Sequence, residues 1–243
     1  MQKKSIYIGT SGWHYKHWKG HFYPEDLNYR GWLEFYAKQL STVEINNTFY
    51  QFPEKKTLEK WRDTVSPPFI FSVKSSRYIT HIKKLKDPDQ GFEKLFLPIE
   101  ALGDKLGPIL FQLPPRWHFN LERLNSFLQA LPPTFRYTFE FRNSSWWREE
   151  VYDALANHGA AFCIFELAGQ LSPKQVTADF VYVRLHGPGD AYQGKYDNRT
   201  LAGWAKAFST WENQGKESFC YFDHDEKGYA AQNALSLQDM FKG

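Results

Sequence analysis

Apolar and polar residues along the chain form two alternating patterns. Short runs rich in β-branched and aromatic side chains are typical of strands, and such runs recur at fairly even spacing. The expected strands are residues 6–9, 42–47, 69–74, 108–113, 137–142, 160–165, 180–186 and 218–222. Between most of them, apolar residues return at the three- and four-residue intervals of an amphipathic helix. The pattern therefore predicts strands that alternate with helices along the whole chain.

Three of the intervening segments carry a clear apolar stripe of helical spacing. The stripes are Trp32, Phe35, Tyr36 and Leu40, then Leu58, Trp61 and Val65, and then Leu121, Leu124 and Leu128. Pro67-Pro68 precedes the third strand and Gly159 precedes the sixth, which are ordinary boundary signals. The exception is the segment 166–179, where Pro173 leaves little room for a helix. We expect an irregular or shortened unit after the sixth strand.

Eight strands alternating with helices fit a closed (β/α)8 barrel, and an open doubly wound sheet is the alternative. The count of eight favours the barrel. No linker, low-complexity stretch or charge block divides the 243 residues. We therefore expect an α/β fold in which residues 1–243 form a single TIM-type barrel domain.

Polar residues stand at strand positions where a barrel interior usually has branched apolar side chains. Their neighbours on either side are mostly apolar, and residues two apart share one face of a strand. The apolar set then faces the helices and the polar set faces the lumen. The polar set is Glu44, Asn46, Lys74, Gln112, Glu140, Arg142, Arg184, His186, Asp223 and His224. We expect these side chains to converge at the carboxyl ends of the strands, where barrel enzymes have their active sites.

The charges in this set indicate the ligand that it prefers. Lys74, Arg142 and Arg184 oppose Glu44 and Glu140, an excess of about one positive charge. Arginine binds phosphate or carboxylate through two parallel hydrogen bonds, so an anionic ligand fits. A purely structural network of salt bridges is the alternative.

Roles for acid–base catalysis follow from the side-chain types. Either Glu44 or Glu140 serves as the general base, and His186 or Lys74 as the acid. Arg142 and Arg184 hold the anion. The expected substrate-binding residues also include Trp13, Asn46, Gln112 and Tyr196. The reaction type stays open among isomerase, lyase and hydrolase.

No metal or cofactor is expected, because three fixed cations would crowd a divalent ion. Asp223 and His224 at the end of the eighth strand leave a metal as the alternative. Cys163 and Cys220 lie in apolar runs without paired spacing, as buried reduced thiols do.

Aromatic residues make up 18% of the chain, and many precede or follow the expected strands. Such rings stack on sugar faces or bases, or pack one loop against another. The formal charge is +3 and the pI about 8.6, below the value typical of a dedicated nucleic-acid domain. A small anionic molecule is the expected partner, with nucleic acid as the alternative. No membrane-length apolar run and no signal peptide are found, so we expect a cytoplasmic location and no membrane partner.

The ordered motifs resemble the YecE-like family, the domain of unknown function 72. They include Gly9-Thr10-Ser11-Gly12-Trp13, Val43-Glu44-Ile45-Asn46, Lys74 with Thr80-His81, Gln112-Leu113-Pro114-Pro115, Glu140-Phe141-Arg142 and Arg184-Leu185-His186-Gly187. The resemblance implies a TIM-type barrel like that of the sugar isomerase and endonuclease IV group, and no established activity. By fold analogy alone it points to sugar phosphates or abasic nucleic acid. The sequence departs from the family at Phe222-Asp223-His224-Asp225, where two Asn usually follow the Phe.

Overall fold

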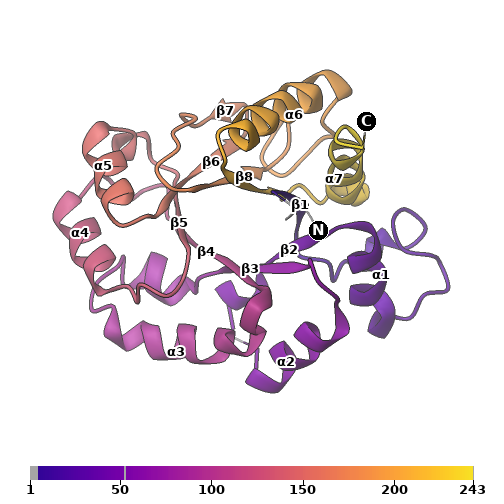
Figure 1. Ribbon diagram of the computed structural model, residues 1–243, viewed down its shortest axis with the longest axis horizontal. Helices are drawn as coiled ribbons and strands as arrows, with labels where there is room; N and C mark the ends of the chain where they lie inside the picture. Colours follow the sequence, from indigo (N-terminus) through magenta and orange to yellow (C-terminus); the bar gives the residue numbers. More distant parts are fainter. Residues whose placement is uncertain (1–4, 52, 243) are drawn as a thin grey trace.

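A ring of parallel strands forms the centre of the molecule (Figure 1). The computed structural model describes residues 5–51 and 53–242. The ring strands are β1 (Ile6–Ser11), β2 (Thr42–Ile45), β3 (Ile70–Lys74), β4 (Leu106–Leu113), β5 (Tyr137–Phe141), β6 (Ala161–Leu167), β8 (Phe180–Leu185) and β9 (Glu217–Phe222). Each pairs in parallel with its neighbours, and the β1–β9 and β5–β6 pairings complete the closure. The expected barrel and all of its strands are confirmed.

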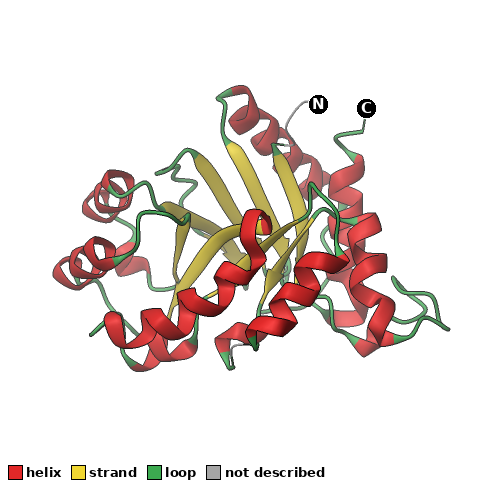
Figure 2. Ribbon diagram, turned by 60° about the horizontal axis from the view of Figure 1, so that its bottom comes forward, coloured by secondary structure: helices red, strands yellow, loops and turns green. Residues whose placement is uncertain are grey.

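Helices surround the ring on its outside (Figures 1 and 2). They are α1 (Trp32–Gln39), α2 (Lys55–Thr64), α3 (Asp89–Ile99), α4 (Leu121–Ala130), α5 (Glu149–Asn157), α6 (Asn198–Asn213) and α7 (Tyr229–Asp239). The three apolar stripes fall on α1, α2 and α4, as the spacing predicts. Their apolar faces pack on the outward-facing residues of the strands, such as Val43 and Phe139. This layer supplies most of the buried apolar area, the main driving force of folding.

The unit between β6 and β8 is irregular, as expected from the sequence. The chain reverses after β6 into the short strand β7 (Gln170–Leu171), which pairs antiparallel with β6. Ser172 then accepts a hydrogen bond from the backbone N–H of Phe165. The described residues 172–179 contain no helix. Pro173 lies in this segment, and proline removes a backbone donor that a continuing helix would need.

The lumen is filled in layers whose character changes along the barrel axis. Near the amino ends of the strands it holds rings such as Tyr7 and Phe219, stacked at 5.0 Å. In the next layer the Tyr221 hydroxyl bonds the side chains of Thr42 and Ser72, at 2.7 and 2.8 Å. Charged side chains follow only at the carboxyl ends of the strands. The lumen is therefore a packed core near the amino ends of the strands and is lined by charged side chains near their carboxyl ends.

No helix among the described residues combines the length and the apolar character needed to cross a membrane.

Candidate functional site

A buried guanidinium links the strands at the upper end of the lumen. Arg184 on β8 has no exposed surface. Its Nε and Nη2 donate to the two carboxylate oxygens of Glu44 on β2, at 3.0 and 2.8 Å. Its Nη1 donates to Glu140 on β5 at 2.7 Å, and Nη2 also reaches Asp223 after β9 at 2.7 Å. One arginine thus joins side chains on β2, on β5 and just after β9.

Glu44 is equally well satisfied. It accepts hydrogen bonds from Ser11 at 2.6 Å and from the Tyr182 hydroxyl at 2.7 Å, besides the two from Arg184. A buried carboxylate is costly unless its lone pairs are filled, and here they are. Glu44 and Arg184 form a fixed polar floor.

A second tier of side chains lies just beyond the ends of β5, β8 and β9. Arg142 donates from Nε to Glu140 at 2.5 Å and from Nη1 to the Tyr192 hydroxyl at 2.8 Å. Its Nη2 lies 3.5 Å from His186 Nε2, a marginal contact. His186 Nδ1 lies 3.1 Å from Asp223 Oδ2, but in a geometry that makes no good hydrogen bond. The contact becomes an ion pair only when the imidazole is protonated.

Above this tier lies a cavity of about 460 Å³. That volume falls in the range of small-molecule sites. Its lining combines charged, amide and aromatic side chains: Tyr15, Asn46, Phe49, Tyr50, Lys74, His81, Gln112, Pro115, Arg142, Tyr192 and Asp223. These residues come from the carboxyl ends of the strands and the loops that follow them.

Lys74, the last residue of β3, differs from the arginines in lacking a partner. No carboxylate oxygen of the described residues lies within ion-pairing distance of its ammonium, which makes no hydrogen bond there either. Instead the nitrogen lies 4.6 Å from the centre of the Phe49 ring. Burial lowers the pKa of Lys74 and the Arg184 charge lowers it further, whereas the charges of Asp223, Glu44 and Glu140 raise it; the net pKa is about 8. The amine therefore titrates close to neutral pH.

Neighbouring cations lower the pKa values of two carboxyl groups in this site. Burial raises the pKa of Glu140, but Arg142 and Arg184 together outweigh it and hold that pKa well below its usual range. Burial likewise raises the pKa of Asp223, and Arg184 and His186 lower it by more. Both side chains are thus ionised at neutral pH.

His81, in the short π-helix Tyr78–Ile82 after β3, is neutral in this setting. Burial lowers its pKa, and the charges of Lys74, Arg77 and Arg142 lower it further, to about 4. Its Nδ1 lies 2.9 Å from the Thr80 hydroxyl. Its ring packs edge-on against Phe49 with centroids 5.1 Å apart, so His81 and Lys74 share one aromatic wall.

Several polar atoms around the cavity have hydrogen-bonding capacity left. Asn46 Oδ1 is buried and makes no hydrogen bond to the described residues. Asp223 uses Oδ2 for its contacts with both Arg184 and His186. Arg142 carries five N–H groups, and only three of them take part in the contacts above. The cavity therefore offers both acceptors and donors to a ligand.

The site residues expected from the sequence form three groups: those that line the cavity, those that are buried beneath it, and those that lie outside it. Lys74, Asn46, Gln112 and Arg142 line the cavity. Glu44, Glu140, Arg184 and His186 are fully buried and do not line it.

Trp13 and Tyr196 lie outside the cavity. Trp13 packs edge-on against Trp61 of α2, with centroids 4.8 Å apart. The Tyr196 hydroxyl accepts a hydrogen bond from the Gly187 backbone at 3.2 Å. Both residues therefore support loops around the site.

Six lining residues received no role from the sequence: Tyr15, Phe49, Tyr50, His81, Pro115 and Tyr192. The four aromatic residues belong to the rings that fit either stacking or packing. His81 stands in a run with three lysines that resembles a solvated helix start. Only its place beside Lys74 in the family motif could have indicated otherwise.

The described residues contain no group of three or more His, Cys, Asp or Glu side chains arranged to hold a metal ion. The His224 side chain has another contact, because its Nε2 lies 3.0 Å from Asn233 Oδ1 in a buried position.

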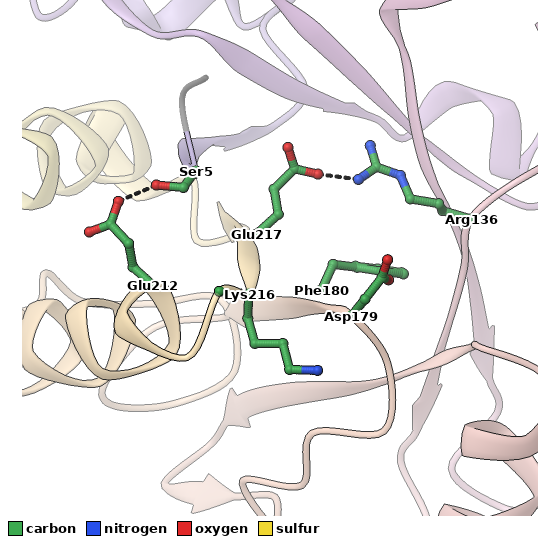
Figure 3. Close-up of a pocket in the computed structure, with 8 residues that line it drawn as sticks. Ser5, Arg136, Asp179, Phe180, Glu212, Lys216 and Glu217 are labelled. Atoms are coloured by element: carbon green, nitrogen blue, oxygen red, sulfur yellow. Dashed lines mark hydrogen bonds and ion pairs between the residues drawn. The ribbon is translucent and has the colours of Figure 1, made fainter. Parts of the chain in front are cut away.

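A second cavity, of about 570 Å³, lies at the opposite end of the barrel, beside the first residues of β8 and β9 (Figure 3). Arg136 pairs with Glu217 there, and its guanidinium lies over the rings of Phe180 and Phe219. Lys216 donates to the Ala178 carbonyl at 2.8 Å. Arg136, Glu217 and Lys216 are thus partnered, which fits the stabilising role of the amino-terminal face in such barrels.

Comparisons with known proteins agree with this architecture. The profile of a family described as "Protein of unknown function DUF72" matches residues 7–243. A crystal structure of a DUF72 family protein from Thermotoga maritima superimposes with a TM-score of 0.88, at 30% identity over 98% of this chain and 99% of that one. The UPF0759 protein YunF of Bacillus subtilis is 23% identical over 97% of this chain and 94% of its own length. For the UPF0759 protein YecE of Escherichia coli the identity is 28%, over 63% of this chain and 54% of YecE.

Proposed function

Because the chain belongs to the DUF72 family, whose description assigns no function, we propose one from the site itself. The protein is an enzyme that binds a small, anionic, hydroxylated molecule at the carboxyl end of the barrel and acts on it by acid–base chemistry. One observation carries this proposal. Lys74 is a cavity-lining cation without a partner among the described residues, in a site where Arg142 and Arg184 are paired.

The charge balance supports an anionic ligand. Glu44, Glu140 and Asp223 all contact a guanidinium, so their charges are largely compensated. Lys74 faces the cavity with no ion-pair partner among the described residues, and Arg142 has spare N–H groups on the same cavity. A phosphate or carboxylate would accept from both residues, in the charge-assisted manner that makes such bonds strong.

The unused acceptors support a hydroxylated ligand. Asn46 Oδ1 is buried and has no hydrogen-bond partner in the part of the chain that the structure describes, and an unpaired buried acceptor costs about 1–3 kcal/mol. Asp223 contributes an ionised carboxylate to the same lining. A ligand with several hydroxyl groups would donate to both residues, while Phe49, Tyr15 and Tyr192 would contact its carbon skeleton.

Within this proposal the fully buried carboxylates hold the arginine side chains of the site in position. Glu140 holds Arg142 in place, and Glu44 does the same for Arg184. Lys74 moves protons, since its pKa of about 8 allows both forms at working pH. His186 Nδ1 lies 3.1 Å from Asp223 Oδ2, and a protonated imidazole there stabilises the negative charge of the carboxylate.

Calorimetric titration with a panel of sugar phosphates and hydroxy acids tests the proposal. We expect binding that weakens at least about tenfold in Lys74→Met and in Arg142→Met, the loss of one charge-assisted bond. The matched control is Lys206→Met, which removes an exposed lysine on α6. Binding unaffected by both cavity variants would contradict the proposal. Oligonucleotide binding that falls steeply with salt would favour the nucleic-acid alternative.

A further inference from the structure

The surroundings of Lys74 are those of an amine nucleophile. Its nitrogen lies against the Phe49 ring, 4.6 Å from the centroid, on the wall of the cavity. The described residues offer it no carboxylate at ion-pairing distance, and burial together with the Arg184 charge outweighs the more distant charges of Asp223, Glu44 and Glu140, which favour protonation. An amine attacks only when neutral, and desolvation beside another cation is a recognised way to favour that form.

We propose that Lys74 forms an imine with the carbonyl carbon of its substrate, a small hydroxylated aldehyde or ketone that carries an anionic group. This inference rests on the proposed function and narrows it from acid–base chemistry in general to covalent catalysis on carbonyl compounds. About a tenth of the Lys74 side chains are neutral at pH 7, against well under a thousandth for an exposed lysine.

The reaction balances without any oxidant or reductant. The lone pair of the neutral nitrogen attacks the carbonyl carbon, and the carbonyl oxygen gains a proton while the nitrogen loses one, which gives a carbinolamine. A further proton on its hydroxyl lets the C–O bond break, and water leaves as the nitrogen lone pair forms the C=N bond. The products are a protonated imine and one water, from the amine, the carbonyl compound and one proton.

His81 is the group placed to relay these protons. It lines the same cavity, shares the Phe49 wall with Lys74, and is neutral at pH 7. A neutral imidazole accepts the proton that the attacking nitrogen sheds. Once protonated it is a stronger acid than an ordinary imidazolium, because its pKa is about 4, and it passes the proton to the departing hydroxyl.

Reductive trapping tests the inference. The wild-type protein is incubated with dihydroxyacetone phosphate, glyceraldehyde 3-phosphate or hydroxypyruvate and sodium cyanoborohydride, which reduces an imine to a stable secondary amine. Peptide mass spectrometry then gives the labelling rate of each lysine. We expect Lys74 to be labelled at least about tenfold faster than the exposed Lys206 in the same molecules, with a rate that rises with pH through about 8.

Labelling of Lys74 no faster than Lys206 with all three compounds would overturn the imine. Glycerol 3-phosphate, which keeps the anion and the hydroxyls but has no carbonyl, separates the two proposals. If it binds to the wild type and more weakly to Arg142→Met, while Lys74 resists trapping, the proposed function stands and the imine falls. If it does not bind while Lys74 is trapped selectively, the imine stands and the anion subsite falls. Loss of the adduct in Lys74→Arg confirms the assignment.

Discussion

At the scale of single residues, Arg184 and Lys74 differ in how the protein compensates their charges. The guanidinium of Arg184 contacts three carboxylates and is fully buried, so it stabilises the arrangement of the strands around it. Lys74 has no such compensation among the described residues and faces the cavity. The two residues illustrate the usual division between support and function in a polar site.

Replacing Arg184 tests its supporting role. Arg184→Met leaves Glu44 buried without its guanidinium partner and removes one of the two guanidinium partners of Glu140, and breaking a buried ion pair costs about 3–5 kcal/mol. We expect a loss of that size in the free energy of unfolding in urea at pH 7. The control Arg199→Met, on the exposed face of α6, should stay within about 0.5 kcal/mol of the wild type. Equal stabilities of the two variants would show that the network contributes little.

The same network predicts how stability depends on pH. The pKa values of Glu140 and Asp223 are lower in the folded protein than in the unfolded chain. Their contribution is therefore complete above the unfolded values of about 4, and it is lost as the pH falls through the folded values. We expect the urea midpoint of the wild type to fall steeply below about pH 4. A midpoint that does not change between pH 6 and pH 3 would contradict the ion pairs.

The sequence predicts which residues face the lumen, but it does not predict which of them line the cavity and which support it from inside the barrel. Alternation along the strands correctly places Glu44, Glu140 and Arg184 in the lumen. It cannot show that Arg184 lies below the cavity and Arg142 beside it, because depth along the axis depends on how the strands are staggered in the closed barrel. His81 was missed for a similar reason, since a π-helical turn brings it back over the strand end.

At the scale of elements, the loop between β8 and α6 forms one side of the cavity. It carries Tyr192, whose hydroxyl accepts a hydrogen bond from Arg142 and whose backbone N–H donates to the His186 carbonyl at 2.8 Å. Gly187 allows this loop to fold back. Its φ is +102°, and a Cβ there would lie 2.2 Å from the Gln193 carbonyl oxygen. Only glycine fits both the conformation and the close approach.

Gly187→Ala should therefore displace the loop and weaken ligand binding about tenfold or more, since strain of 1–3 kcal/mol must be relieved by moving residues that line the cavity. Gly189→Ala is the matched control in the same loop, because its Cβ would meet no atom within 4 Å. Titration calorimetry with glycerol 3-phosphate measures both. Equal affinities would show that this loop takes no part in binding.

Most elements could be predicted because each carries its own pattern. The apolar stripe of α4 and the β-branched run of β8 can each be recognised from the residues of that element alone. By contrast, β7 has only two residues, and it exists because the chain turns back onto β6. A pairing of that length has no periodicity to find, so only the presence of Pro173 indicated that the unit was unusual.

At the scale of the whole molecule, the barrel closes by pairing its first strand with its last. Five residue pairs join β1 to β9, from Ile6 with Ser218 to Thr10 with Phe222. Neither end of the chain can complete a sheet without the other. We therefore expect residues 1–243 to unfold as a single domain. Tryptophan fluorescence and far-ultraviolet circular dichroism should give one coincident urea transition. Two separated transitions would contradict the single domain.

The cavity at the upper end of the barrel is lined by Lys74, which has no ion-pair partner among the described residues, and we propose that it binds an anionic ligand. The most direct test of this central claim is an NMR titration of protein labelled with 13C at lysine Cε, with the Lys74 signal assigned from its absence in Lys74→Arg. We predict a Lys74 pKa of about 8 in the free protein, and a higher pKa when a bound anion compensates the ammonium. A Lys74 pKa near 10.4, equal to that of the exposed lysines and unchanged by sugar phosphates, would contradict the account.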